Sequence, residues 1–323
     1  MIEHARHPTL TTIGSGITQI DTMLAGEPEF NAVYLLDGDE PTLVEAGPGA
    51  DVPVVLEALQ LLGIGEHDIA HIVVTHIHID HAGAVGSLMP RFPGAVVHVH
   101  DRGAPHLADP TRLVASTART YGRERMLSLY GETLPVPSDR IRAVVGGDHI
   151  SLGDRTLRVL HTPGHASHHV ALVDESGGGV FTGEAIGSHL PWADCYRPAL
   201  PPPEVDVEVA LASIELIRAQ RPSVLLTSHF GVVRDADEGC DRGADRIRAW
   251  SEAVRSELER DPAVDVDAIA ETLHRRAAGD YFADAGGPID LARYNVIGSI
   301  EMNAAGLARY WRKRLEADGT PAL

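Results

Sequence analysis

The sequence has little cysteine, no long apolar run and few positive charges. Cys195 and Cys240 are its only cysteines and cannot build a disulfide framework, which favours a reducing cytoplasm. No apolar run approaches the ~20 residues that span a bilayer, and the first residues lack the apolar core of a signal peptide. Lys and Arg number 27 against 46 Asp and Glu, a net charge of −19. Such an acidic surface disfavours nucleic acid and anionic membranes as partners, so we expect a cytoplasmic protein.

Histidine is the abundant functional residue. Hydrophobic residues make up 44% and charged residues 23% of the 323 residues, which is typical of a globular protein. This length suits one large domain, or a domain with an appendage, and buries a core without disulfides. The 18 histidines matter because histidine is the commonest metal ligand and the usual acid–base group near neutral pH.

Short β-branched and apolar runs alternate with longer helical patterns. We expect strands at 32–36, 42–45, 71–75, 95–99, 148–152, 156–160, 170–173, 179–182 and 224–227, and helices at 51–62, 110–129 and 205–220. From about Cys240 the pattern is charged helix to the end. Two β-rich stretches, each followed by helices, predict a layered α/β protein with mixed sheets. Gly14-Ser15-Gly16 does not open a helix after a strand, so it is no dinucleotide-binding loop.

The strongest motif follows the expected strand 71–75. His76, His78, Asp80 and His81 place four metal-binding side chains within six residues. A tight turn can direct alternate side chains at one point, as a chelate requires. Imidazole mixed with carboxylate suits zinc, iron or manganese. A polar loop with chance histidines would rarely have this spacing, so we interpret the motif as a metal site.

Three more strand ends carry metal-binding side chains, namely His165, Glu184 and His229. Loops at one edge of a layered α/β protein converge on a single cleft. The combined set of five histidines and two carboxylates is too large for one metal and suits two metals that share a bridge. We expect His169 to orient a ligand, and we assign no role to His168.

These residues and their spacing resemble the metallo-β-lactamase superfamily over about residues 10 to 235. The resemblance implies an αββα sandwich with the metals at the sheet edge. It makes residues 1–238 the catalytic domain and 239–323 a helical C-terminal extension. It also implies the metal ligands: His76, His78 and His165 for the first ion, Asp80, His81 and His229 for the second, and Glu184 as the bridge.

Glu184 departs from the family pattern, because the superfamily usually has Asp at the bridging position. The resemblance implies two divalent transition-metal ions, zinc first, with iron or manganese as alternatives. Such a pair, about 3.5–4 Å apart, holds a hydroxide that attacks a carbonyl or phosphoryl group. Asp80 would orient the water and then pass its proton to the leaving group. This predicts a dinuclear hydrolase acting on a small thioester, ester, lactone or phosphodiester.

Within the superfamily, the glyoxalase II-like, thioesterase and lactonase branches fit best. His78 counts against the flavodiiron reductases, which have Glu there, and the acidic charge counts against nucleic-acid-processing members. The complete second site (Asp80, His81, His229) counts against persulfide dioxygenases. The alternative is a non-hydrolytic protein that binds metal or oxygen, such as a sensor.

Substrate selectivity is expected in segments that overhang the cleft. One group of candidates lies in 110–130, namely Tyr121, Arg123, Arg125 and Tyr130. A second group follows Glu184, namely His189, Trp192, Asp194 and Tyr196. Phe30 and Leu24, before the expected strand 32–36, are weaker candidates. The tail carries an apolar stripe at helical spacing: Ile297, Ile300, Ala304, Leu307, Trp311 and Leu315. The stripe predicts either docking onto the main domain or a homodimer contact.

Overall fold

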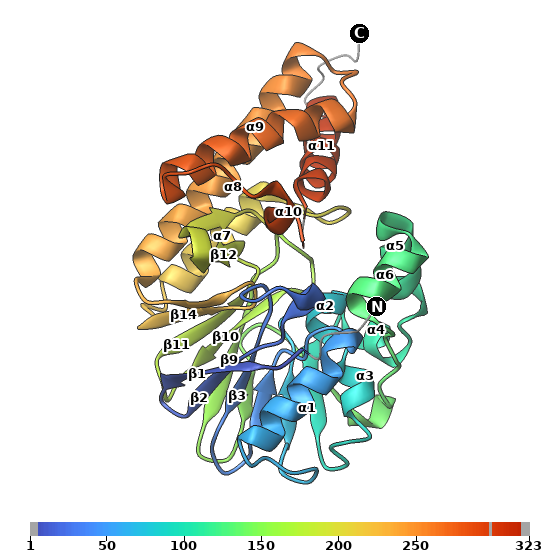
Figure 1. The fold of residues 1–323 in the computed structure, drawn as a ribbon, viewed down its shortest axis with the longest axis vertical. Coiled ribbons are helices and arrows are strands. Elements are labelled where there is room, and N and C mark those ends of the chain that lie inside the picture. The colour runs from blue at the N-terminus through green and yellow to red at the C-terminus, as the bar shows by residue number, and fades with distance from the viewer. Residues whose placement is uncertain (1–5, 297–298, 318–323) are drawn as a thin grey trace.

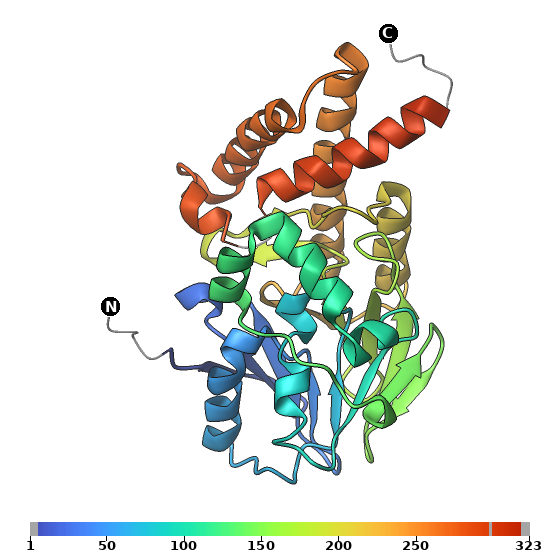
Figure 2. The same cartoon turned by 90° about the vertical axis from the view of Figure 1, so that its right-hand side faces the viewer.

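The computed structural model describes residues 6–296 and 299–317 (Figures 1 and 2). Two mixed β-sheets pack face to face, with helices on both outer faces and further helices at one end. The expected αββα sandwich with C-terminal helices is therefore confirmed.

The first sheet has seven strands in chain order. Neighbouring strands are antiparallel from the first to the fourth and parallel from the fourth to the seventh. They are β1 (Thr9–Gly14), β2 (Ile17–Asp21), β3 (Ala32–Leu36), β4 (Thr42–Val44), β5 (His71–Val73), β6 (Val96–His100) and β7 (Ile141–Val144).

The second sheet has six strands in the order β15-β14-β11-β10-β9-β8. Its strands are antiparallel except for the parallel pair β11 and β14. They are β8 (His149–Ser151), β9 (Thr156–His161), β10 (Val170–Asp174), β11 (Gly179–Gly183), β14 (Val224–Thr227) and β15 (Gly231–Val233). A separate hairpin joins β12 (Ser188–Leu190) to β13 (Cys195–Arg197).

Short helices follow the strands of the first sheet, and longer ones follow the second sheet. The first group is α1 (Val52–Leu61), α2 (Ile79–Ala82), α3 (Val85–Leu88), α4 (Ala104–Ala108), α5 (Thr111–Tyr121) and α6 (Arg123–Tyr130). The second group is α7 (Val207–Arg218), α8 (Ala236–Arg260), α9 (Val266–Ala285), α10 (Leu291–Tyr294) and α11 (Ile300–Ala317). Within the described ranges, no helix has the length and apolarity to cross a membrane.

The central strands are apolar on both sides because each sheet is covered on both faces. In β3, Val33 and Leu35 pack with α1 and α3, whereas Tyr34 and Leu36 pack between the sheets. On the far side, β11 and β14 share one hydrophobic cluster with α7, α8, α9 and α11, which includes the fully buried Trp250. This three-layer core fixes the ends of β5, β9, β11 and β14, which carry the histidines and carboxylates.

The expected strands at 32–36 and 42–45 are confirmed as β3 and β4, which pair antiparallel. The expected single helix at 110–129 is wrong. Gly122 has φ +77° and separates α5 from α6, because residues in this left-handed region do not continue an α-helix. The strands β1, β2, β7, β12, β13 and β15 were not among those expected from the sequence.

The apolar stripe of the tail packs inside the chain. Ile300, Ala304 and Leu307 are fully buried in the cluster of the second sheet, with Trp311 and Leu315 packed against it. Ile297 lies outside the described residues. The buried part of the stripe therefore packs onto the rest of the chain, and a homodimer stays a prediction.

Candidate metal centre

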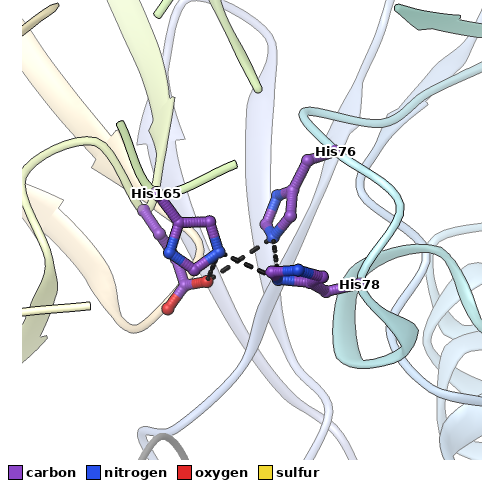
Figure 3. Close-up of side chains that lie close together, drawn as sticks. His76, His78 and His165 are labelled. Atoms are coloured by element: carbon purple, nitrogen blue, oxygen red, sulfur yellow. Dashed lines mark hydrogen bonds and ion pairs between the residues drawn. The ribbon is translucent and has the colours of Figure 1, made fainter. Parts of the chain in front are cut away.

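Three histidines from two loops meet at one point (Figure 3). His76 and His78 lie between β5 and α2, and His165 lies between β9 and β10. The Nδ1 atom of His78 is 3.0 Å from Nε2 of His76 and 2.9 Å from Nε2 of His165. These nitrogens and a Glu184 oxygen form a group of potential ligands.

A second group lies beside the first. Asp80 and His81 are in the short helix α2, and His229 follows β14. Nε2 of His229 is 3.1 Å from Nε2 of His81 and 3.5 Å from Oδ2 of Asp80. The three side chains again form a group of potential ligands.

The Glu184 carboxylate lies between the two groups. Its Oε2 atom is 2.9 Å from Nε2 of His165, and 3.5 Å from Nε2 of both His76 and His81. Its Oε1 atom is 3.8 Å from Nε2 of His229. The structure thus brings all seven predicted side chains together, with Glu184 facing both groups, and their role as ligands stays a prediction.

The outer nitrogens of these imidazoles are held by hydrogen-bonding groups. Nδ1 of His165 is 2.9 Å from the Ala199 carbonyl, and Nδ1 of His229 is 2.7 Å from the Phe30 carbonyl. A carbonyl can only accept, so each Nδ1 carries a proton, and in the neutral ring Nε2 then has a lone pair directed at the cluster. This arrangement fixes both ring orientation and tautomer, as in metal-binding histidines.

Burial and neighbouring charges set the protonation of several of these side chains. Burial lowers the pKa of His78 to about 3 and that of His76 well below its usual range. Burial also acts to lower the pKa of His165, but the neighbouring Glu184 carboxylate raises it above its usual value. Burial raises the pKa of Asp80, but the neighbouring His81 and His229 lower it to about 2. At neutral pH His76 and His78 are therefore neutral imidazoles and Asp80 is an ionised carboxylate, the forms that bind metal.

The donor set fits transition-metal ions. Around a tetrahedral ion with metal–nitrogen bonds of ~2.0–2.1 Å, ligand nitrogens stand about 3.3 Å apart. The separations of 2.9–3.1 Å between facing nitrogens approach this value. In a neutral imidazole whose Nδ1 carries the proton, Nε2 has only a lone pair. A cation is therefore a suitable partner for Nε2.

Sequence reasoning missed Glu45. It is 1% exposed, and its Oε1 accepts hydrogen bonds from Thr75 Oγ1 (2.5 Å) and Ser228 Oγ (2.8 Å) and lies 3.2 Å from His81 Nδ1. Its φ of +67° is unusual for a residue with a side chain. A lone acidic residue directly after the apolar strand 42–44 was the available signal.

His169 holds the backbone of Glu184. The Glu184 N–H donates to His169 Nε2 at 3.1 Å, and His169 Nδ1 is 2.8 Å from Thr162 Oγ1. Gly183 has φ +54°, and a Cβ there would lie 2.4 Å from His169 Nε2. Glycine therefore allows the close approach that fixes Glu184.

The sequence profile of the Metallo-beta-lactamase superfamily matches residues 26–229. This chain belongs to that superfamily. It is similar to the metallo-beta-lactamase fold-containing protein ST1585 of Sulfurisphaera tokodaii, with 26% identity over 212 residues, 64% of this chain and 75% of the relative. It is also similar to the acyl-coenzyme A thioesterase MBLAC2 of Gallus gallus, with 31% identity over 190 residues, 56% of this chain and 67% of the relative.

The crystal structure of the metallo-beta-lactamase family protein TTHA1429 from Thermus thermophilus shares the fold. It aligns with a TM-score of 0.67 at 21% identity and covers 95% of each chain. At this coverage, the alignment includes most of the C-terminal helices. The superfamily fold thus extends beyond the 26–229 segment that the profile matches.

A cavity of about 360 Å³ opens beside the cluster. His78, Asp80, His165 and Glu184 line it, with α5, the proline-rich loop 198–203 and the start of α11 as its other walls. Several of its lining residues are apolar: Ile77, Ile79, Leu113, Ala166, Leu200 and Met302. The cavity therefore combines metal-binding groups with an apolar wall.

The predicted substrate contacts divide into two groups. Tyr121 and Tyr130 line the cavity, with ring centroids 5.6 Å apart, and burial raises the pKa of both phenols. The other expected contacts do not line it within the described residues: Arg123, Arg125, His189, Trp192, Asp194, Tyr196, Phe30 and Leu24. His168 and Arg197 line it instead. No local pattern distinguishes Arg197 from nearby polar residues, because its position depends on the β12–β13 hairpin.

Proposed function

We propose that this protein is a dinuclear metal-dependent hydrolase that cleaves acyl thioesters of small molecules in the cytoplasm. The observation that carries the proposal is the Glu184 carboxylate, which faces both ligand groups at the wall of a partly apolar cavity. A carboxylate between two groups of ligands offsets the repulsion between two cations held there.

Each proposed metal position has three ligands of its own. His76, His78 and His165 would hold the first ion, while Asp80, His81 and His229 would hold the second. Zinc suits these nitrogen and oxygen ligands, and iron or manganese would also fit. When bound, the metals would supply Lewis acidity, which activates water near neutral pH and polarises the carbonyl under attack.

The protein's own groups would move protons and orient the substrate. Asp80 lines the cavity, and its low pKa leaves an ionised oxygen that can accept a proton and pass it to the departing thiolate. The phenols of Tyr121 and Tyr130 stay neutral at pH 7 because burial raises the pKa of both. They are hydrogen-bonded to each other, so one of the two hydroxyls is free to donate to the thioester carbonyl.

A thioester is the substrate class that the cavity favours. Its apolar wall suits an acyl chain, and burying such a chain contributes about 0.8 kcal/mol per methylene. The similar protein of Gallus gallus is named an acyl-coenzyme A thioesterase. The net charge of −19 disfavours polyanionic substrates such as nucleic acids.

The test is metal content together with a substrate panel. Purified protein should contain close to two transition-metal ions per chain, as these two three-ligand groups imply. Among an acyl thioester, an aryl ester, a lactone and a phosphodiester, the thioester should give the highest kcat/KM. Protein without metal after supplemented expression, or a phosphodiester as the best substrate, would contradict the proposal.

A further inference from the structure

Arg197 is a buried cation on the wall of the cavity. It ends β13, is 2% exposed, and lines the cavity together with Asp80 and Glu184. Burying a charge is costly unless an opposite charge or hydrogen bonds compensate it. The partners of Arg197 therefore indicate whether its charge is compensated within the protein or would be compensated by an anionic ligand.

The guanidinium has only neutral partners. Its Nη1 donates to the Tyr294 carbonyl, and Nη2 makes a long contact of 3.4 Å to Ser188 Oγ. The Tyr294 ring lies 5.3 Å from its central carbon. Nε has no hydrogen-bond partner among the described residues. The guanidinium therefore has N–H donors at Nε and Nη2 that the protein does not fully use.

Arg197 also lacks a counter-ion. Within the described part of the chain, no carboxylate lies within 4.0 Å of it. Arg155, the other buried arginine, has Asp174 at 3.6 Å. The carboxylate that acts electrostatically on Arg197 is that of Glu184, which is already shared among the histidines of the metal centre. Bound metal ions would take up the charge of Glu184 and leave the positive charge of Arg197 uncompensated.

The hairpin fixes Arg197 relative to the centre. Ser188, four residues after Glu184, pairs with Arg197 across the β12–β13 hairpin. A group bound at Arg197 therefore sits at a set distance from the reacting carbonyl. Because guanidinium binds carboxylate through charge-assisted hydrogen bonds, often two at once, this is a suitable carboxylate anchor.

We propose that Arg197 binds a carboxylate on the acyl group of the substrate. The preferred substrates are then acyl thioesters whose acyl chain ends in a second, ionised carboxylate. This inference rests on the proposed thioesterase function and adds its substrate class. We assign this anion to the acyl group, because the apolar wall of the cavity next to the candidate metal ligands suits an acyl chain.

Kinetics with matched thioesters test the proposal. N-acetylcysteamine thioesters carry no phosphate, so succinyl, glutaryl and adipyl derivatives have the acyl carboxylate as their only anion. The hexanoyl derivative is an uncharged match for the glutaryl one. Wild-type enzyme should prefer a carboxylated member of the series. Arg197→Gln should lower kcat/KM for that substrate roughly 10- to 100-fold, mainly through KM, the size expected for a charge-assisted hydrogen bond. Its kcat/KM for hexanoyl thioester should fall much less, so that the ratio of kcat/KM between the two substrates changes roughly 10- to 100-fold.

A matched variant separates binding from a structural role. Arg312 Nη2 donates to the Val264 carbonyl and does not line the cavity, so Arg312→Gln removes a similar arginine–carbonyl contact elsewhere. It should leave the preference for a carboxylate unchanged. Arg197→Lys should recover part of that preference, since it keeps the charge but loses the planar fork. Equal losses of Arg197→Gln on charged and uncharged substrates would overturn the proposal.

Direct binding distinguishes failure of this inference from failure of the thioesterase function. Calorimetry would compare glutaric monoamide with hexanamide, two amides that resist hydrolysis. Wild-type protein should bind the acid more tightly, and Arg197→Gln should abolish the difference. If thioesters are hydrolysed but neither binding nor kinetics favours the carboxylate, the anchor is wrong and the function stands. If no thioester is hydrolysed, the proposed function is wrong. The calorimetric comparison then still shows whether Arg197 binds a carboxylate.

Discussion

Replacing Glu184 is the most direct test of a shared carboxylate. Its Oε2 is the atom close to both groups, at 2.9 Å from His165 and 3.5 Å from His81. In Glu184→Ala the second ion should be lost before the first, because the first keeps three histidines. The variant should retain about one metal per chain, because the shared carboxylate no longer offsets the repulsion between two cations, and it should lose most hydrolysis.

Glu184→Asp is the sharper variant. It withdraws the carboxylate by about 1.5 Å, the length of one C–C bond. The backbone cannot advance to compensate, because the Glu184 N–H is bound to His169 Nε2 at 3.1 Å. The Cβ position at Gly183 is also closed by His169 at 2.4 Å. A misplacement of ~1 Å can cost about a hundredfold in rate, so we expect a loss of that order despite the conserved charge.

The assay is metal per chain after gel filtration, with thioester turnover on the same samples. Glu215→Ala, an exposed glutamate on α7, is the control and should keep both metals and full turnover. Two metals and full turnover in Glu184→Ala would refute the reasoning, because Glu184 would then not be a ligand. Full turnover in Glu184→Asp would show that the backbone at Gly183 adapts.

Three other predictions concern the histidines and Glu45. His78→Ala should lose first-site metal and activity, whereas His67→Ala, an exposed histidine, should change neither; elemental analysis decides. Glu45→Gln removes the charge 3.2 Å from His81 Nδ1 and should weaken second-site affinity about 10- to 100-fold in a chelator competition. Burial lowers the pKa of His98 to about 4. Between pH ~6.5 and ~4, His98 is therefore protonated in the unfolded chain but not in the folded chain. The free energy of unfolding falls as the pH falls through this range. In His98→Gln, denaturant titrations should show a pH slope smaller by up to about 1.4 kcal/mol per unit, and an unchanged slope would contradict this.

The clustering of the candidate ligands could be predicted because chelating turns are local. His76, His78, Asp80 and His81 occupy one turn after β5, and their spacing can be seen without knowing the rest of the fold. A strand such as β3 is a continuous apolar run, since both of its faces are buried. Local sequence therefore contained both the candidate ligands and most of the strands that carry them.

The walls of the cavity could not be predicted in this way, because they are built from distant segments. Tyr121 lies in α5 and Met302 in α11, yet both line the same cavity. The break between α5 and α6 depends on one glycine inside a helical pattern, which an amphipathic periodicity does not reveal. Short strands such as β12 and β13 contain three residues each, too few to show an alternating pattern.

These distant contacts give the C-terminal helices a part in the site. Figure 2 shows α5 and α11 at the same end of the sheets. Helix α11 packs against the loop that follows β13. Asn303 Oδ1 accepts from the Leu200 N–H at 2.9 Å, and a Cβ at Gly306 would lie 1.9 Å from the Leu200 carbonyl oxygen. Arg197 in turn holds the Tyr294 carbonyl, just before α11. Since the same loop supplies cavity wall and holds His165 through the Ala199 carbonyl, movement of α11 would reach both the cavity wall and a predicted metal ligand. The helical tail therefore contributes to the candidate site, and changes in its packing should alter ligand preference as well as stability.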